Sequence, residues 1–172
     1  MHSYCLLIQH SDTLEDDNYL RLGTALRGRG HGVACAFMDS LRLMDGSLLA
    51  DGFAMADGGL CAGQRLPPCS AIRLAEVDVV WVLGLGDRAS FLDKVQLLRL
   101  LEGSAVVINS PDALMHLKSK YSLTAMGDFL RHPETHASSN AAELINILTE
   151  RGGDWIAKPP AGSLGNDVFL IN

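Results

Sequence analysis

Val77-Asp78-Val79-Val80-Trp81-Val82-Leu83 is apolar at every position except Asp78, and Gly84-Leu85-Gly86 follows it. Consecutive apolar residues are typical of a strand that is buried on both faces, as the strands of a parallel sheet are. Apolar residues at helical spacing from Phe91 to Leu101 come next, and then a short apolar run from Ala105 to Ile108. The three segments predict one strand-helix-strand unit.

The N-terminal residues repeat this order of elements. Tyr4 to Ile8 and Gly32 to Met38 are apolar runs that predict strands, and apolar residues at helical spacing begin at Tyr19 between them. Gly28 and Gly30 are expected to end that helix. Residues 1–110 therefore predict an α/β domain with an open, parallel, Rossmann-like sheet and helices on both faces.

Asp-Gly pairs recur between the second and third predicted strands, as Asp45-Gly46, Asp51-Gly52 and Asp57-Gly58. This dipeptide favours the positive φ angles of tight hairpin turns. A six-residue β-helix would need many more repeats. Local hairpins are therefore expected here.

The composition argues against several classes of function. The chain has 20 acidic and 14 basic residues, a net charge of -6, and no basic stripe of the kind that binds nucleic-acid phosphates. The N-terminus lacks the basic region of a secretory signal, and no apolar run approaches the roughly 20 residues of a membrane span. We expect a cytoplasmic protein that binds neither nucleic acid nor membrane.

The four cysteines and six histidines do not suggest a metal site. Cys5 and Cys35 lie in apolar runs, whereas Cys61 and Cys69 flank a proline-containing loop without Cys-x-x-Cys spacing. Free, buried thiols are expected in a reducing compartment. The histidines show no ligand spacing, so zinc is not expected.

Beyond Asn109 the pattern becomes that of a second lobe. Its expected elements are a helix carrying His116, Lys118 and Lys120, a helix from Ala141 to Arg151, and strands from Trp155 to Lys158 and from Val168 to Ile171. We therefore expect two domains, residues 1–112 and an apparently incomplete α+β domain of residues 113–172.

Lys158 ends an apolar strand, where a lysine must reach solvent or meet an anion, because burying it unpaired costs several kcal/mol. Gly162 and Gly165 in the following loop permit backbone N–H groups to face inward, and Ser163 adds a hydroxyl donor. The lysine precedes the glycines, so this is not a Walker loop. A phosphate-binding lid and a plain surface hairpin explain these residues equally well.

A longer series of residues resembles a known family. The series is Ile108-Asn109-Ser110-Pro111-Asp112-Ala113-Leu114, then Lys120, Pro133-Glu134-Thr135, Ile156-Ala157-Lys158-Pro159 and the glycine loop. Its order and spacing resemble bacterial glutathione synthetase of the ATP-grasp superfamily. Residues 1–112 are also similar to the leading, pre-ATP-grasp domain of that family.

The resemblance implies that Lys120 and Lys158 contact ATP phosphates and that Gly162, Ser163 and Gly165 form a lid. It also implies ATP and Mg²⁺ as cofactors and small-molecule carboxylate and amine substrates. The reaction of such a ligase is ATP-dependent amide-bond formation through an acyl phosphate.

The chain departs from the family pattern in several places. It has Leu83-Gly84-Leu85-Gly86-Asp87-Arg88 where the family has a basic stretch beside the substrate, so γ-glutamylcysteine is not carried over as substrate, and Leu164 replaces a lid glycine. After Lys158 the only carboxylate side chain is Asp167, and no arginine follows. We expect no catalytic residue and no ligation by this chain alone, which is either a fragment of a longer ligase or a shortened relative. A shortened relative would be a non-catalytic nucleotide-binding or scaffolding module, and a scaffold is expected to form a homo-oligomer.

One competing motif is Gly84-Leu85-Gly86-Asp87-Arg88-Ala89, which fits a dinucleotide-binding fingerprint and would predict NAD or FAD binding. The motif follows an internal strand rather than the first one, and Asn109-Ser110 stands where the ribose-binding acid would be expected. A tight strand-to-helix turn is the favoured interpretation.

Overall fold

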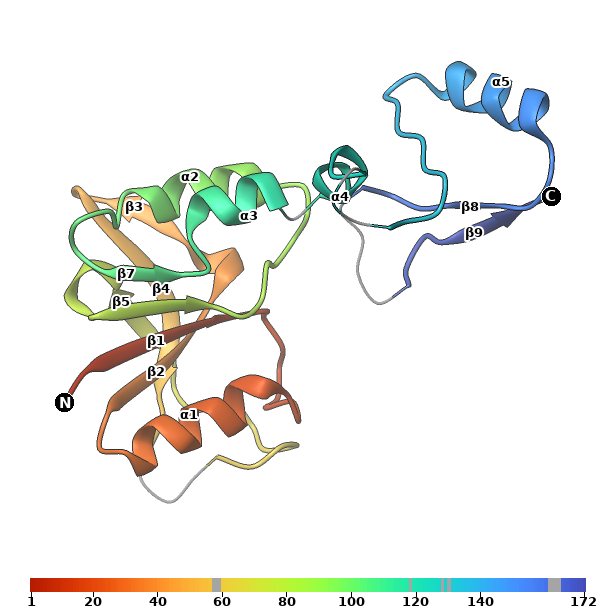
Figure 1. Cartoon of the computed structure of the whole chain (residues 1–172). Helices are drawn as coiled ribbons and strands as arrows, with labels where there is room; N and C mark the ends of the chain where they lie inside the picture. The colour runs from red at the N-terminus through yellow and green to blue at the C-terminus, as the bar shows by residue number, and fades with distance from the viewer. Residues whose placement is uncertain (57–59, 118, 128, 130, 161–164) are drawn as a thin grey trace. The chain divides into compact units, whose positions relative to one another are not determined.

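The computed structural model describes residues 1–56, 60–117, 119–127, 129, 131–160 and 165–172 (Figure 1). The chain divides into two compact units, residues 1–114 and 115–172. The predicted domain boundary after residue 112 lies close to this division.

The first unit is built on a mixed seven-stranded sheet. Its parallel part has the order β2-β1-β6-β7, with β1 at Ser3–Ile8, β2 at Gly32–Phe37, β6 at Val79–Val82 and β7 at Val106–Ile108. The antiparallel part consists of β3 (Arg42–Met44), β4 (Ser47–Ala54) and β5 (Ser70–Arg73), and β4 joins it to β2. The sheet is therefore not parallel throughout. The β3-β4 connection is too short for the crossover that parallel neighbours require.

Helices lie on the two faces of this sheet. In Figure 1, α1 (Asn18–Gly28) lies on one face, and α2 (Phe91–Arg99) and α3 (Pro111–Leu117) lie on the other. The Asp17 carboxylate accepts a hydrogen bond from the Asn18 N–H at the start of α1, and Gly30 follows its end with φ +82°. The predicted first helix is thus confirmed. The core between sheet and α1 contains Leu6, Ile8, Leu14, Tyr19, Leu20, Val33, Cys35, Phe37, Phe53 and Met55.

The Asp-Gly pairs do not all form turns. Asp45 and Gly46, with φ of 49° and 72°, form the two-residue turn between β3 and β4, so the predicted hairpin is confirmed there. Asp51-Gly52 lies inside β4, and the predicted turn is wrong. A Cβ atom on Gly52 would overlap the Cys35 carbonyl and the Ala36 Cα of β2, so this glycine permits close approach of two strands. Asp57-Gly58 lies outside the described residues.

The second unit holds α4 (Tyr121–Ala125), α5 (Ala141–Arg151) and an antiparallel pair, β8 (Trp155–Ala157) and β9 (Phe169–Ile171). The Asn140 side chain accepts a hydrogen bond from the Ala142 N–H and caps α5, whose predicted bounds are confirmed. The prediction of a single helix that carries both His116 and Lys120 is wrong, because α3 ends at Leu117 and Lys120 precedes α4. Lys118 lies outside the described residues.

The second unit has little internal core. Within its described residues no side chain is fully buried. Ile156 and Leu170 pair across β8 and β9, and 57% and 63% of their surface is exposed. Apolar side chains on paired strands normally face a second layer.

Among the helices that the structure describes, none combines the length and apolar character needed to cross a bilayer.

The cysteines separate into two kinds. All four are free, as predicted, but Cys61 and Cys69 are exposed rather than buried. Burial raises the pKa of the Cys5 thiol to about 12, and burial beside Cys5 raises the pKa of Cys35 to about 12. Since the thiolate is the nucleophile, the two buried thiols should be inert in the folded protein.

We therefore expect Ellman's reagent at pH 8 to modify two thiols rapidly and the other two only after denaturation. The expected fast sites are Cys61 and Cys69. The double variant Cys61→Ser/Cys69→Ser is the control, and it should show no rapid reaction. Rapid reaction of all four thiols in the native protein would contradict the burial of Cys5 and Cys35.

Candidate functional site

Lys120 is hydrogen-bonded to the residues that follow Lys158. The Lys120 backbone N–H donates to the Pro160 carbonyl at 2.9 Å, and its ammonium Nζ donates to the carbonyls of Pro159 at 3.2 Å and Pro160 at 3.4 Å. Lys158 lies directly after β8, with an exposed side chain. The structure thus brings Lys120 to the segment that carries Lys158.

The first turn of α4 fixes the Lys120 backbone. The Thr124 hydroxyl and the Thr124 N–H both donate to the Lys120 carbonyl, at 3.1 and 3.3 Å. The Pro159 and Pro160 carbonyls accept these hydrogen bonds, and neither proline has a backbone N–H to donate. Two ammonium groups on adjoining segments form an arrangement that can attract a polyanion.

The predicted lid is described only in part. Gly165 has φ +74°, a left-handed conformation that glycine adopts readily, and it lies in the connection between β8 and β9. Gly162 and Ser163 lie outside the described residues. The role of these three residues stays a prediction.

The Pro133-Glu134-Thr135 stretch is tied to α5. Glu134 Oε1 lies 2.9 Å from His136 Nε2 and 3.6 Å from Arg151 Nη1 at the end of that helix. The hydrogen bond to His136, together with the charge of Arg151, lowers the pKa of Glu134. The His136 ring packs against Trp155, with ring centroids 5.7 Å apart. These contacts hold the polar stretch beside the start of β8.

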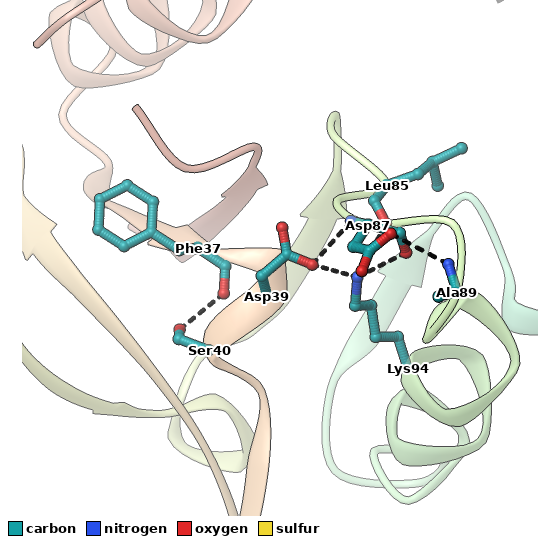
Figure 2. A network of polar contacts seen from close by, with 7 residues as sticks. All are labelled: Phe37, Asp39, Ser40, Leu85, Asp87, Ala89 and Lys94. Atoms are coloured by element: carbon teal, nitrogen blue, oxygen red, sulfur yellow. Dashed lines mark hydrogen bonds and ion pairs between the residues drawn. The ribbon is translucent and has the colours of Figure 1, made fainter. Parts of the chain in front are cut away.

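The glycine turn of the first unit has a different environment (Figure 2). Lys94 of α2 is 5% exposed and forms an ion pair with Asp39 of the 3-10 helix η1 (Met38–Ser40). Its ammonium also donates to the Asp87 carbonyl at 2.9 Å, and the Asp87 N–H donates to Asp39 Oδ1 at 2.8 Å. The turn is therefore bonded to a lysine and an aspartate from two other elements.

The charge on Asp39 is stabilised in this environment. Burial alone would raise the pKa of Asp39, but hydrogen bonds from Lys94 and the Asp87 N–H, with the charge of Lys94 and the nearby His10, lower it. Asp39 is therefore the anionic partner of Lys94 at neutral pH.

This arrangement disfavours the dinucleotide interpretation of Gly84 to Ala89. A phosphate at such a turn would be bound by inward-facing N–H groups and a nearby cation. Here the Asp87 N–H and the Lys94 ammonium are both directed at Asp39. The geometry favours a tight strand-to-helix turn.

Sequence reasoning missed Asp39 and Lys94. Lys94 occupies a helical position next to the buried Val95 and one turn before the buried Leu98, so a lysine on the apolar face of α2 was a usable signal. Asp39 follows the apolar run of β2, but nothing in its local sequence identifies Lys94 as its partner.

No protein-family model and no curated protein matches the chain. Solved structures do. An ATP-grasp RimK domain protein from Sphaerobacter thermophilus matches with a TM-score of 0.62 and 19% identity, over 98% of this chain and 53% of the other. The ATP-grasp ligase PsnB, complexed with a minimal precursor, matches with a TM-score of 0.53 and 18% identity, over 100% of this chain and 57% of PsnB.

A second PsnB structure, with minimal precursor, Mg and ADP, matches with a TM-score of 0.50 and 19% identity, over 99% of this chain and 57% of the other. The chain thus spans somewhat more than half the length of these proteins. At such low identity the similarity concerns the fold alone. The chain has the mixed α/β fold of the corresponding part of ATP-grasp ligases.

Proposed function

We propose that this chain provides the pre-ATP-grasp unit and part of the nucleotide-binding unit of a cytoplasmic ATP-dependent carboxylate–amine ligase of the glutathione-synthetase type. The observation that carries the proposal is the bonding of Lys120 to Pro159 and Pro160, directly after Lys158. The ATP-grasp fold of the similar solved structures supports it. In this proposal residues 1–112 are the Rossmann-like domain and residues 113–172 begin the ATP-binding domain.

In the proposed site Lys120 and Lys158 bind the phosphates of ATP. Lys120 is half-buried and held by the carbonyls of the Pro159-Pro160 segment, so little side-chain freedom is lost when a phosphate binds. Lys158 is exposed and supplies a second cation. Gly162, Ser163 and Gly165 form the lid. When bound, ATP supplies the phosphoryl group that activates a substrate carboxylate for attack by an amine.

The described residues do not form a magnesium site. Magnesium is usually held by one or two carboxylates together with substrate phosphates in octahedral geometry. Asp167 is the only carboxylate side chain after Lys158, and the described part of the chain has no group of three His, Cys, Asp or Glu that could hold a metal ion. In this proposal the described residues bind the phosphates of ATP, and none of them is a magnesium ligand or a catalytic residue.

Calorimetric titration with ATP in the presence of magnesium tests the proposal. The wild-type chain should bind ATP, and Lys158→Ala should weaken binding by about tenfold or more, since a hydrogen bond to a charged group contributes about 1.5–3 kcal/mol. Arg29→Ala is the control, because it removes one exposed cation from the first unit and should leave ATP affinity unchanged. Absence of ATP binding to the wild type, or equal affinity in Lys158→Ala, would contradict the proposal.

A second candidate is a scaffolding module that associates through the second unit. The exposure of Ile156, Leu170 and Phe169 favours it, because apolar strand residues open to solvent promote association. Sedimentation velocity over a range of concentrations separates this candidate from a monomeric nucleotide-binding chain.

A further inference from the structure

The turn after β6 surrounds a carboxylate of the same chain. Asp39 Oδ1 accepts hydrogen bonds from the Asp87 N–H and from the Lys94 ammonium. The ammonium also lies 2.9 Å from the Asp87 carbonyl and 3.5 Å from the Leu85 carbonyl. Figure 2 shows Asp39 and Lys94 pointing toward each other below this turn. The donors around Asp39 are thus supplied by two parts of the chain far from it in sequence.

Gly86 shapes the turn around this carboxylate. Its φ is +62°, and a Cβ atom at this position would overlap the Asp39 carboxylate. Glycine is therefore required here both for its backbone conformation and for the space that Asp39 fills. The absence of a side chain at Gly86 therefore leaves room for the Asp39 carboxylate against the turn.

Lys94 places a buried positive charge beside this turn. It is the only charged side chain among the described residues that is fully buried. A buried cation without a counter-ion is strongly unfavourable, so this lysine requires an anion. The Asp39 side chain is 34% exposed, so its removal would leave the ammonium beside a space that opens to solvent.

We propose that Lys94 and the Leu85–Ala89 turn form an anion-binding site for small carboxylates, and that the Asp39 side chain is its resident occupant. Asp39 acts as a positioning residue that holds the turn in one conformation at the carboxyl end of β6. The proposal concerns the first unit and does not depend on ATP binding by the second.

Chemical rescue of Asp39→Ala tests this site. The variant should have a lower Tm than the wild type, and sodium formate should raise that Tm saturably, by roughly 2–4 °C at high occupancy. Formate carries the two oxygens of the lost carboxylate and is small enough for the vacated space. Sodium chloride at equal ionic strength controls for screening and should not reproduce the effect.

Two further proteins sharpen the test. The wild type should show no saturable response to formate, since Asp39 occupies the site, and Asp39→Ala/Lys94→Met should show none because the cation is gone. No formate response in folded Asp39→Ala, or an equal response in the wild type or the double variant, would overturn the proposal.

A second measurement, on a different variant, tests the proposal if Asp39→Ala does not fold. Asp39→Asn keeps the shape of the side chain but removes its charge. Hydrogen exchange at the Asp87 amide should then be at least about tenfold faster than in the wild type, because a hydrogen bond to a charged acceptor is replaced by one to a neutral acceptor. Unchanged exchange at Asp87 would overturn the positioning role.

Discussion

Gly52→Val is expected to lower the free energy of unfolding of the first unit by at least about 3 kcal/mol, because overpacking against backbone cannot be relieved by a rotamer change. A Cβ atom at Gly52 would overlap the Cys35 carbonyl and the Ala36 Cα on the neighbouring strand. The register pairs Gly52 with Ala36, and β2 is a central strand. Relief of the overlap would require β4 to move away from β2 and break the hydrogen bonds that join the antiparallel strands to the parallel ones.

Gly32→Val is the matched control, since Gly32 also lies in a strand of the same sheet. Its nearest neighbour for an added Cβ is the Ser3 Cα at 4.0 Å, which is ordinary van der Waals contact. Valine has a higher strand propensity than glycine, so this variant should be as stable as the wild type or more so. Urea denaturation of both variants measures the difference, and equal stability would show that strand β4 can shift away from β2 at little cost.

The contrast between Asp45-Gly46 and Asp51-Gly52 shows how far the local sequence determines the fold. The same dipeptide forms a tight turn in the first case and lies within a strand in the second. The difference comes from β2, whose close approach to β4 requires a residue without a side chain. Contacts between distant strands are not encoded in the dipeptide, so its turn propensity alone could not distinguish the two cases.

Elements with a strong periodic pattern and a local cap were predictable. The α5 helix has its predicted bounds because Asn140 caps its start and because apolar residues follow at helical spacing. The α1 helix is similar, with Asp17 at its start and Gly30 after its end. Such signals act over one or two turns of chain, so they survive without knowledge of tertiary contacts.

The candidate sites were predictable to different degrees. Lys120 and Lys158 could be singled out because a family resemblance identifies their positions, whereas the hydrogen bonds from Lys120 to Pro159 and Pro160 required the structure. The Asp39–Lys94 pair joins η1 to α2 and has no sequence motif. A buried lysine can be suspected from its position on an apolar helix face, but its counter-ion depends on the packing of that helix.

Phe53→Ala should destabilise the first unit by about 3–5 kcal/mol, the range for truncating a buried phenylalanine. Phe53 is 1% exposed, and the centroid of its ring lies 6.2 Å from that of Phe37 in the core between the sheet and α1. Its loss would leave a cavity bounded by the sheet and the helix, which cannot close without moving either. Denaturant unfolding monitored by circular dichroism measures the change.

Phe129→Ala is the comparison, because the same substitution is made in the second unit, where Phe129 is 87% exposed. Its removal deletes few contacts, so the change should stay within about 0.5 kcal/mol. A loss comparable to that of Phe53→Ala would show that Phe129 is covered by protein in solution, through association with another copy or another chain. If the two losses differ as expected, the same substitution has different effects because Phe53 lies between the sheet and α1, whereas Phe129 belongs to a unit without a fully buried side chain among its described residues.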